Sequence, residues 1–248
     1  SGSPAAQPGR RSFLSRIAAV LILCVTGAVA VQLGHRLATS AVVDLGPTDT
    51  HYVRDFRDVE RDGPDYFRWS TTPSSTVVLP MRFCGPGSVT LRARRHFVDP
   101  AVISVSLSGS VLGQRSVQAR EDHPYDVVTF NVPMITCAST ASVLLEASVE
   151  NERPLGVAVD WLEIRAPAGF AASNPTLIRG ALVVGLTAAT LFAAGTGVAF
   201  ALTGGGLLAG LMAMTFASAP VAAERMLRGG LIALALNLVL GAAIARMG

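Results

Sequence analysis

The stretch LGVAVDWLEIR, residues 155–165, alternates its side chains as a β-strand does, but its apolar face changes half-way along. In the first half, one face carries the side chains of Leu155, Val157, Val159 and Trp161. In the second half, the opposite face carries the side chains of Leu162 and Ile164. Two interpretations account for the change. Either a β-bulge at Asp160–Trp161 re-aims the side chains, or both faces of the strand are covered.

The pair Asp160–Trp161 has a functional and a structural interpretation. In the first, a bulge presents both side chains at a rim where a sugar or a partner binds. In the second, Trp161 anchors the core and Asp160 ties down a neighbouring loop, with Arg68 or Arg165 as its cationic partner, because an unpaired buried carboxylate is costly. A strand so rich in Val and Leu is mainly core, which favours the structural interpretation.

Composition points to a membrane protein with one sizeable extramembrane domain. The 248 residues are 50% hydrophobic and only 15% charged. Sixteen of the seventeen acidic residues fall between Asp44 and Glu163, and all twenty basic residues are arginine. Residues 41–166 carry more acids than arginines, and this balance argues against a nucleic-acid partner, which would favour a basic patch.

Long apolar runs predict four transmembrane helices, since about 20 residues cross a bilayer. The predicted order is a flexible cytoplasmic tail (1–13), a transmembrane helix (14–36), an extracytoplasmic β-sandwich (41–166), a linker (167–176) and three transmembrane helices (177–202, 205–221 and 229–246). Arg10, Arg11 and Arg16 precede the first helix and place the N-terminus in the cytoplasm by the positive-inside rule. Arg225 and Arg228 disagree, because they fall on the outer side.

Period-two alternation recurs through the middle of the chain and predicts its fold. It is clearest in SVTLRAR (88–94), VISVSLSG (102–109) and DVVTFNVP (126–133), with Gly, Pro, Asp and Asn clustered between such runs. We therefore expect an antiparallel β-sandwich of jelly-roll type, inserted between the transmembrane helices.

The cysteines predict one disulfide. Cys24 lies within the first apolar run, whereas Cys84 and Cys137 lie in the predicted outside domain, where an oxidising compartment favours their pairing. No CxxC or His-rich spacing indicates a metal site, no catalytic motif is present, and we expect no cofactor. The predicted spans hold no Asp or Lys, and Asn237 is the only strongly polar residue well inside one of them, which argues against a transporter or pump.

Sugar binding is the ligand chemistry that suits such a sandwich best, because aromatic rings stack on sugars while polar groups bind hydroxyls. The opposing interpretation is that most of these rings are core. The candidate ligand- or partner-binding residues are Tyr52, Tyr66, Arg68, Trp69, Asp160 and Trp161.

The pieces FRWS (67–70) and LGVAVDWLEI (155–164) resemble the N-terminal part of a group of bacterial polytopic membrane proteins that are often labelled glycosyltransferases. The resemblance covers residues 41–166 and, in outline, the spans that follow. It implies one membrane anchor, then a jelly-roll domain similar to carbohydrate-binding modules, then many spans. Any catalytic aspartates would lie in those later spans, so the resemblance transfers no catalytic residue to this chain.

These observations predict a non-enzymatic accessory protein of the bacterial cytoplasmic membrane. Its sandwich, on the extracytoplasmic side, recognises a glycan or a partner protein, and its helices contact the lipid bilayer and other membrane-protein subunits. Two alternatives stay open. One is a structural subunit of a large respiratory or photosynthetic membrane complex. The other is a truncated or split part of a membrane glycosyltransferase, for which a neighbouring reading frame would supply the missing helices.

Overall fold

The computed structural model describes residues 8–71, 74–94, 101–117, 125–134, 140–148 and 155–247. Side chains are described within these ranges except for residues 8–12, 155 and 236–247. The chain divides into two compact units. One is the sandwich domain, Arg36–Ser173, and the other is the helical unit, formed by the segment up to His35 together with the segment from Asn174 onward.

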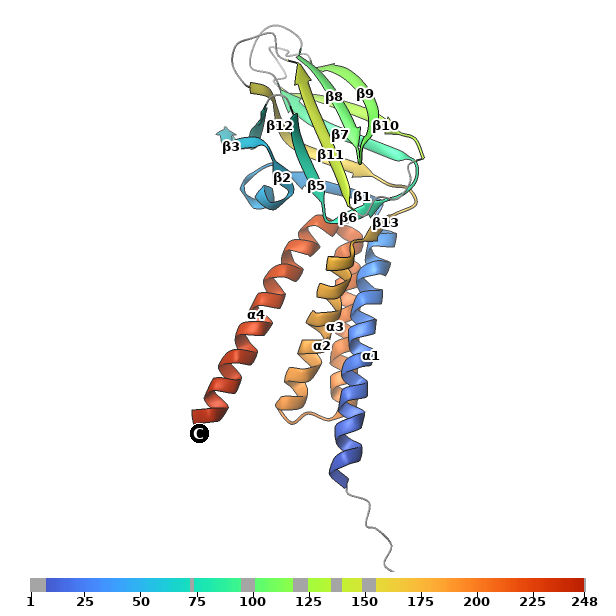
Figure 1. Ribbon diagram of the computed structural model, residues 1–248, viewed down its shortest axis with the longest axis vertical. Helices are drawn as coiled ribbons and strands as arrows, with labels where there is room; N and C mark the ends of the chain where they lie inside the picture. Colours follow the sequence, from blue (N-terminus) through green and yellow to red (C-terminus); the bar gives the residue numbers. More distant parts are fainter. Residues whose placement is uncertain are drawn as a thin grey trace, which may run out of the picture. The chain divides into compact units, whose positions relative to one another are not determined.

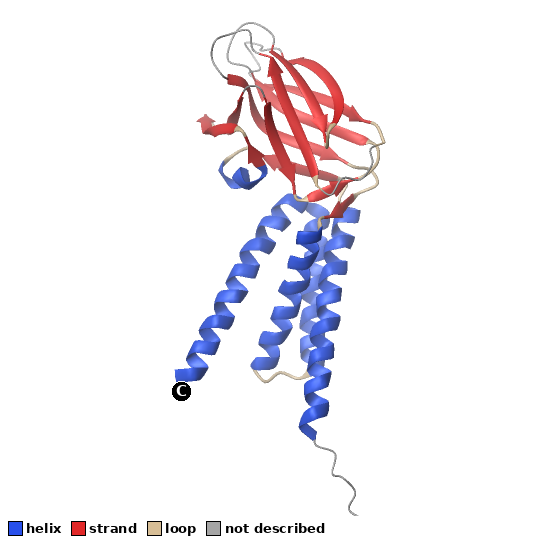
Figure 2. Ribbon diagram, in the orientation of Figure 1, coloured by secondary structure: helices blue, strands red, loops and turns tan. Residues whose placement is uncertain are grey.

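Two antiparallel sheets form the sandwich domain (Figure 2). The six-stranded sheet has the order β10 (Tyr125–Val132), β7 (Gly87–Arg94), β12 (Leu155–Arg165), β4 (Asp65–Thr71), β3 (Phe56–Asp62), and β1 (Ser40–Asp44) also pairs with β12. The five-stranded sheet has the order β2 (Val53–Arg54), β5 (Ser74–Leu79), β11 (Ala141–Ser148), β8 (Ala101–Leu107), β9 (Ser110–Val117). A small third sheet pairs β13 (Phe170–Ala172) with β6 (Met81–Phe83), and a 3₁₀ helix, η1 (Pro47–Tyr52), follows β1.

The predicted alternation is confirmed in the core of the sandwich. On β7 the side chains of Val89, Leu91 and Ala93 are fully buried, while the arginines between and after them face outward. The same pattern buries residues of β8, β10 and β11, namely Ile103, Val105, Leu107, Val128, Phe130, Val132, Val143 and Leu145. Burial of apolar side chains from both sheets therefore specifies an antiparallel sandwich, as expected.

A β-bulge on β12 explains the change of face in residues 155–165. Val159 pairs with Ala93 of β7, but Trp161 pairs with Arg92, so Asp160 is an extra residue in the ladder. Val157 and Val159 are buried before the bulge, and Leu162 and Ile164 are buried after it. The bulge is confirmed, and the other interpretation also holds in part, because Ala158 is buried on the opposite face beside Phe67 and Trp69.

The helical unit contains α1 (Pro8–Leu37), α2 (Asn174–Ala193), α3 (Val198–Ser218) and α4 (Pro220–Met247). In Figure 1, α1, α2 and α3 run side by side, while α4 leans away from them toward its C-terminal end. Among the described residues, three helical segments are long and apolar enough to cross a membrane: Phe13–Leu37, Asn174–Ala193 and Val198–Ser218. The fourth span and the sidedness stay predictions.

Several predicted boundaries are wrong. The helix expected at 177–202 ends at Ala193, and the next begins at Val198, so the stretch TGGG (203–206) lies inside α3 and causes no break. Gly195 ends α2 instead. Its φ of +83° is left-handed, and the amides of Gly195 and Thr196 donate to the carbonyls of Phe192 and Leu191. This is the bonding of a Schellman cap, which a glycine adopts without strain.

Three further boundaries differ from the prediction. Helix α1 begins at Pro8, within the segment predicted to be a flexible tail, because nothing in PGRRSF breaks a helix. The predicted linker 167–176 contains β13 and the start of α2. Helix α4 begins at Pro220, so the charged stretch AERMLRGG lies within a helix and does not separate two spans.

Candidate functional site

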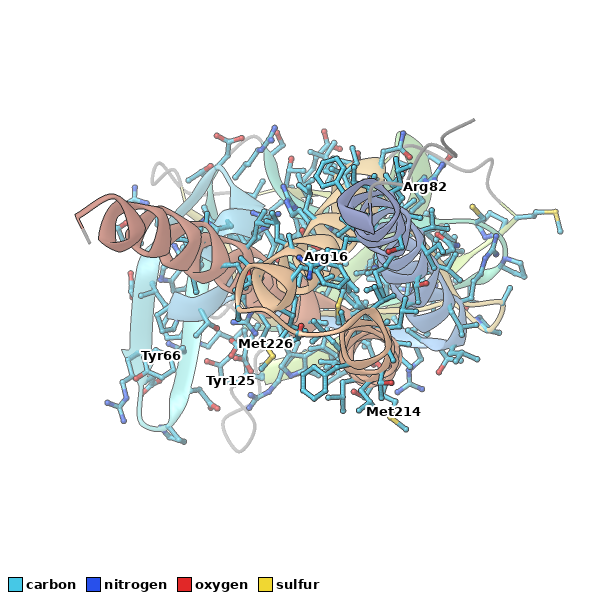
Figure 3. The ribbon with its side chains drawn as sticks, turned by 90° about the horizontal axis from the view of Figure 1, so that it is seen from below. Arg16, Tyr66, Arg82, Tyr125, Met214 and Met226 are labelled. Carbon is cyan, nitrogen blue, oxygen red and sulfur yellow. The ribbon has the colours of Figure 1, made fainter. Side chains whose placement is uncertain are left out.

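An open pocket lies on the outward face of the six-stranded sheet, where β1 and β4 meet β12. Its volume is about 460 Å³. The lining residues come from β1, the β3–β4 turn, β4 and the bulge of β12: Val42, Asp44, Pro64, Asp65, Tyr66, Asp160, Trp161 and Glu163. Figure 3 shows Tyr66 on the β3–β4 hairpin.

The pocket exists because two strands share one edge of β12. Strand β4 pairs with β12 as far as Val159, and β1 pairs with it from Trp161 onward. The bulge residue Asp160 falls between the two, and its carbonyl accepts a hydrogen bond of 2.8 Å from the amide of Leu45. The bulge turns Asp160 and Trp161 outward together at this junction.

Arg68 fixes the junction from inside the sandwich. Its side chain is buried, and its Nε donates to the Leu45 carbonyl at 3.0 Å. Its other nitrogens donate to the Arg57 carbonyl at 3.2 Å and to Oγ1 of Thr50 at 2.9 Å. Arg68 therefore has a structural role, since its donors bind groups of the domain itself.

Arg92 of β7 organises the carboxylates at the pocket. It pairs with Asp65 at 3.3 Å and with Asp160 by a short ion pair. Its guanidinium carbon lies 4.1 Å from the ring centroid of Tyr125, within the range of a cation–π interaction. The guanidinium thus holds two carboxylates from different strands in fixed positions while the ring of Tyr125 packs against it.

Burial disfavours the ionised form of the Asp160 carboxyl group. Burial raises the pKa of Asp160 above its ordinary value, Arg92 lowers it in part, and the nearby carboxylates of Asp65 and Asp44 raise it further. The net result is a raised pKa, so the attraction of Arg92 does not fully offset the loss of water and the repulsion of the neighbouring acids.

The other two acids at the pocket have their own partners. Glu163 accepts a hydrogen bond from Nε of Arg165 at 3.0 Å. Asp44 accepts one from the amide of Gly46 at 2.9 Å, which holds its carboxylate near the end of β1. Within the described residues, no group of three or more His, Cys, Asp or Glu side chains is arranged to hold a metal ion.

The structure brings three of the six predicted site residues together at the pocket: Tyr66, Asp160 and Trp161. The prediction that Trp161 anchors the core is wrong, because the bulge leaves its side chain only half-buried at the pocket. The predicted cationic partners of Asp160 were also wrong, since Arg68 is occupied inside the domain and Arg165 pairs with Glu163.

The other predicted binding residues lie away from the pocket. Tyr52 is only 2% exposed and lies at the end of η1. Trp69 is 5% exposed and packs edge-on against Phe67, with ring centroids 6.0 Å apart, beside the fully buried Ala158. For these two residues the core interpretation is correct.

Sequence reasoning missed Arg92 and Asp65. The alternation of SVTLRAR indicates that Arg92 faces outward, and the sequence carries no further signal for it. Its pairing with Asp65 and Asp160 depends on which strands are neighbours, and a single sequence does not specify that.

The predicted disulfide stays a prediction. Cys84 follows β6, but Cys137 lies outside the described residues. Cys24, in α1, is a free cysteine.

Comparison with known proteins finds no matching family model and no matching curated protein. Among solved structures, the chain is similar to a family 35 carbohydrate-binding module from Clostridium thermocellum, with 9% identity and a TM-score of 0.38, over 52% of this chain and 99% of that one. A CBM35 from Cellvibrio japonicus Abf62 matches with 15% identity and a TM-score of 0.37, over 54% and 98%. A β-1,3-glucan-binding CBM6 from Bacillus halodurans matches with 18% identity and a TM-score of 0.37, over 52% and 98%. At these values the chain is assigned to no family.

Proposed function

We propose that this protein is a membrane-anchored, non-enzymatic glycan-binding protein, and that the pocket at the β12 bulge is its binding site. The observation that supports the proposal is the bulge itself. It places a half-buried tryptophan and a carboxylate side by side on the outward face, next to Tyr66 and Asp65. Rings beside fixed hydrogen-bond acceptors are the groups that a sugar needs.

The rings and the carboxylates would contribute in different ways. Trp161 and Tyr66 offer apolar faces against which the CH groups of a sugar ring can pack. Asp65 and Asp160 offer acceptor oxygens for hydroxyl groups, and Arg92 holds both in place before a ligand arrives. Carboxylates held in position lose little conformational freedom on binding, which favours affinity.

The helical unit supports an anchoring role. Three of its helical segments are long and apolar enough to cross a membrane. Arg10, Arg11 and Arg16 stand before or at the start of the first of them, which supports a cytoplasmic N-terminus and an extracytoplasmic sandwich. In this proposal the sandwich recognises glycans outside the cytoplasmic membrane of a bacterium.

Tryptophan fluorescence tests the binding site directly, because the chain has only two tryptophans. The full chain in lipid nanodiscs would be titrated with a panel of neutral oligosaccharides, with isothermal calorimetry on those that change the fluorescence. A bound sugar should alter the emission of Trp161 at the pocket and leave that of Trp69 in the core unchanged. The Trp161→Phe variant, which keeps only Trp69, should therefore bind without a fluorescence change.

Trp161→Ala should weaken binding by about 2 kcal/mol, roughly 30-fold, as expected for an aromatic anchor. Val111→Ala is the matched control, because Val111 is exposed on β9 of the other sheet. Full affinity in Trp161→Ala, or no binding of any glycan by the folded wild-type chain, would refute the proposal.

A further inference from the structure

The pocket at the β12 bulge is acidic. Four of its eight lining residues are carboxylic acids, and none of the described lining residues is basic: the acids are Asp44, Asp65, Asp160 and Glu163. A site for hydroxyl groups alone needs acceptors, and uncharged hydroxyl or amide side chains supply these equally well. The excess of carboxylates therefore points to a ligand that brings a positive charge.

Only part of the negative charge at the pocket is neutralised by the protein. Two arginines pair with three of the acids. Asp44, the fourth acid, is exposed and has no cationic partner among the described residues, and its carboxylate accepts a hydrogen bond of 2.9 Å from the amide of Gly46. Four carboxylates and two paired arginines leave a net negative charge at this surface.

The carboxylates are close enough to act on one another. The negative charges of Asp65 and Asp44 both raise the pKa of Asp160, as nearby like charges do. They do so although Arg92 is bound to two of the three groups. A positive group of a ligand would relieve this repulsion, so the pocket favours a cation over a neutral group.

Asp44 stands beside the ring of Trp161. The two residues are directly opposite each other in the antiparallel β1–β12 ladder. Their side chains therefore leave the sheet on the same face, with Cβ atoms about 5 Å apart. A group bound against the ring of Trp161 would thus lie within reach of the Asp44 carboxylate.

The ring of Trp161 is also the aromatic surface that is open to a ligand cation. Arginines already lie over the two nearby tyrosines, with Arg61 5.4 Å from the ring centroid of Tyr66 and Arg92 4.1 Å from that of Tyr125. Within the part of the chain that the structure describes, no arginine lies over Trp161. Indole is the side chain that binds cations best through its ring face.

We propose that the glycan bound at this pocket carries a free, protonated amino group, as in a hexosamine unit without an acetyl group. The ammonium group binds between the ring of Trp161 and the carboxylate of Asp44. It is attracted to both surfaces at once, whereas a hydroxyl group gains neither the ring attraction nor the charge pairing. The same acids repel glycans built from uronic acids. This inference rests on the proposed glycan-binding function and specifies its ligand.

Three oligosaccharides that differ in a single group test the inference. Oligomers of β-1,4-linked glucosamine, N-acetylglucosamine and glucose have the same backbone and carry an ammonium, an acetamide or a hydroxyl group at carbon 2. At equal length, each would be titrated by calorimetry into the full chain in nanodiscs of zwitterionic lipid, slightly below neutral pH, with empty nanodiscs as the blank. We expect the glucosamine oligomer to bind about tenfold more tightly than the other two, with a preference that shrinks as salt is added.

Asp44→Asn removes the charge and keeps an oxygen that accepts from the Gly46 amide. It should reduce the preference for the glucosamine oligomer about threefold and leave the affinity for the glucose oligomer unchanged. Asp58→Asn is the matched control, because Asp58 is exposed on β3 of the same sheet and does not line the pocket. It should leave the preference unchanged.

The inference is overturned if the glucosamine oligomer binds no more tightly than the other two, or if the two asparagine variants reduce its preference equally. Glucosamine binding that Trp161→Ala does not weaken would show non-specific attraction and would overturn it as well. In the first two cases, binding of the glucose oligomer at the pocket would leave the glycan-binding proposal standing. A folded chain that binds no glycan at all would refute both.

Discussion

Replacing the two tryptophans in turn should affect the stability of the sandwich very differently. Trp69 is 5% exposed and packs against Phe67 and Ala158, so Trp69→Ala leaves a cavity in the core. Such a change costs about 3–5 kcal/mol, out of a total stability of roughly 5–15 kcal/mol. Trp161 stands half-buried at the open pocket, so Trp161→Ala should cost less, about 1 kcal/mol, the centre of the range for point substitutions.

Both losses of stability can be measured on the unfolding of the sandwich domain alone. Both tryptophans lie in the sandwich domain, and each alanine variant keeps the other tryptophan as its reporter. Thermal unfolding followed by fluorescence should show Tm lowered by about 10 °C or more in Trp69→Ala and by about 4 °C in Trp161→Ala. Trp69→Phe, which refills part of the space, should recover part of the loss.

Equal losses of stability in the two alanine variants would refute the reasoning. Trp161 would then be a core residue, and the outward direction that the bulge gives it would be incorrect. The glycan-binding proposal would lose its main support with it, because the pocket depends on that direction.

Two further predictions follow from the bulge and from the break between α2 and α3. Because the pKa of Asp160 is raised, the folded state holds the Asp160 proton more tightly than the unfolded state does. The stability of the sandwich should therefore fall as the pH rises from 3.8, the ordinary pKa, through the pKa of the folded state. Asp160→Asn should remove this pH dependence from unfolding curves measured across that range. Gly195→Ala should destabilise the helical unit by about 1 kcal/mol in detergent unfolding, because φ is +83° there, whereas Gly197→Ala, with equal space and φ of −73°, should be nearly neutral.

Much of the sandwich could be predicted because burial imposes a period of two on its strands. The alternation of SVTLRAR places its apolar residues on one face, and these residues, Val89, Leu91 and Ala93, are fully buried. The position of the change of face in residues 155–165 is also visible in the sequence, since a regular strand covered on one face only cannot bury both Val159 and Leu162. The sequence left open whether a bulge or a covered second face caused it, because that depends on the partner strand.

The failures share a physical cause, which is that they depend on three-dimensional neighbours. Arg92 became the partner of Asp160 only because β7 pairs with β12 in a particular register. The predicted break between 202 and 205 falls beside three consecutive glycines, residues 204–206, but glycine ends a helix only where the chain adopts a left-handed cap, as at Gly195. Inside α3, Gly205 instead allows close approach of Leu23 from α1.

The bulge offers a test by deletion that no substitution provides. Without Asp160, Val159 opposite Ala93 would be followed directly by Trp161 opposite Arg92, and the alternation of β12 would become regular. Val159 and Leu162 would still face the core, so the deletion should leave the sandwich folded, with the loss of the hydrogen bond from the Leu45 amide. It should also remove the Arg92–Asp160 ion pair and, with it, glycan binding. Circular dichroism would measure the fold and calorimetry the binding. An unfolded deletion variant would contradict the view that Asp160 is an insertion made for the pocket, since the core would then need the extra residue.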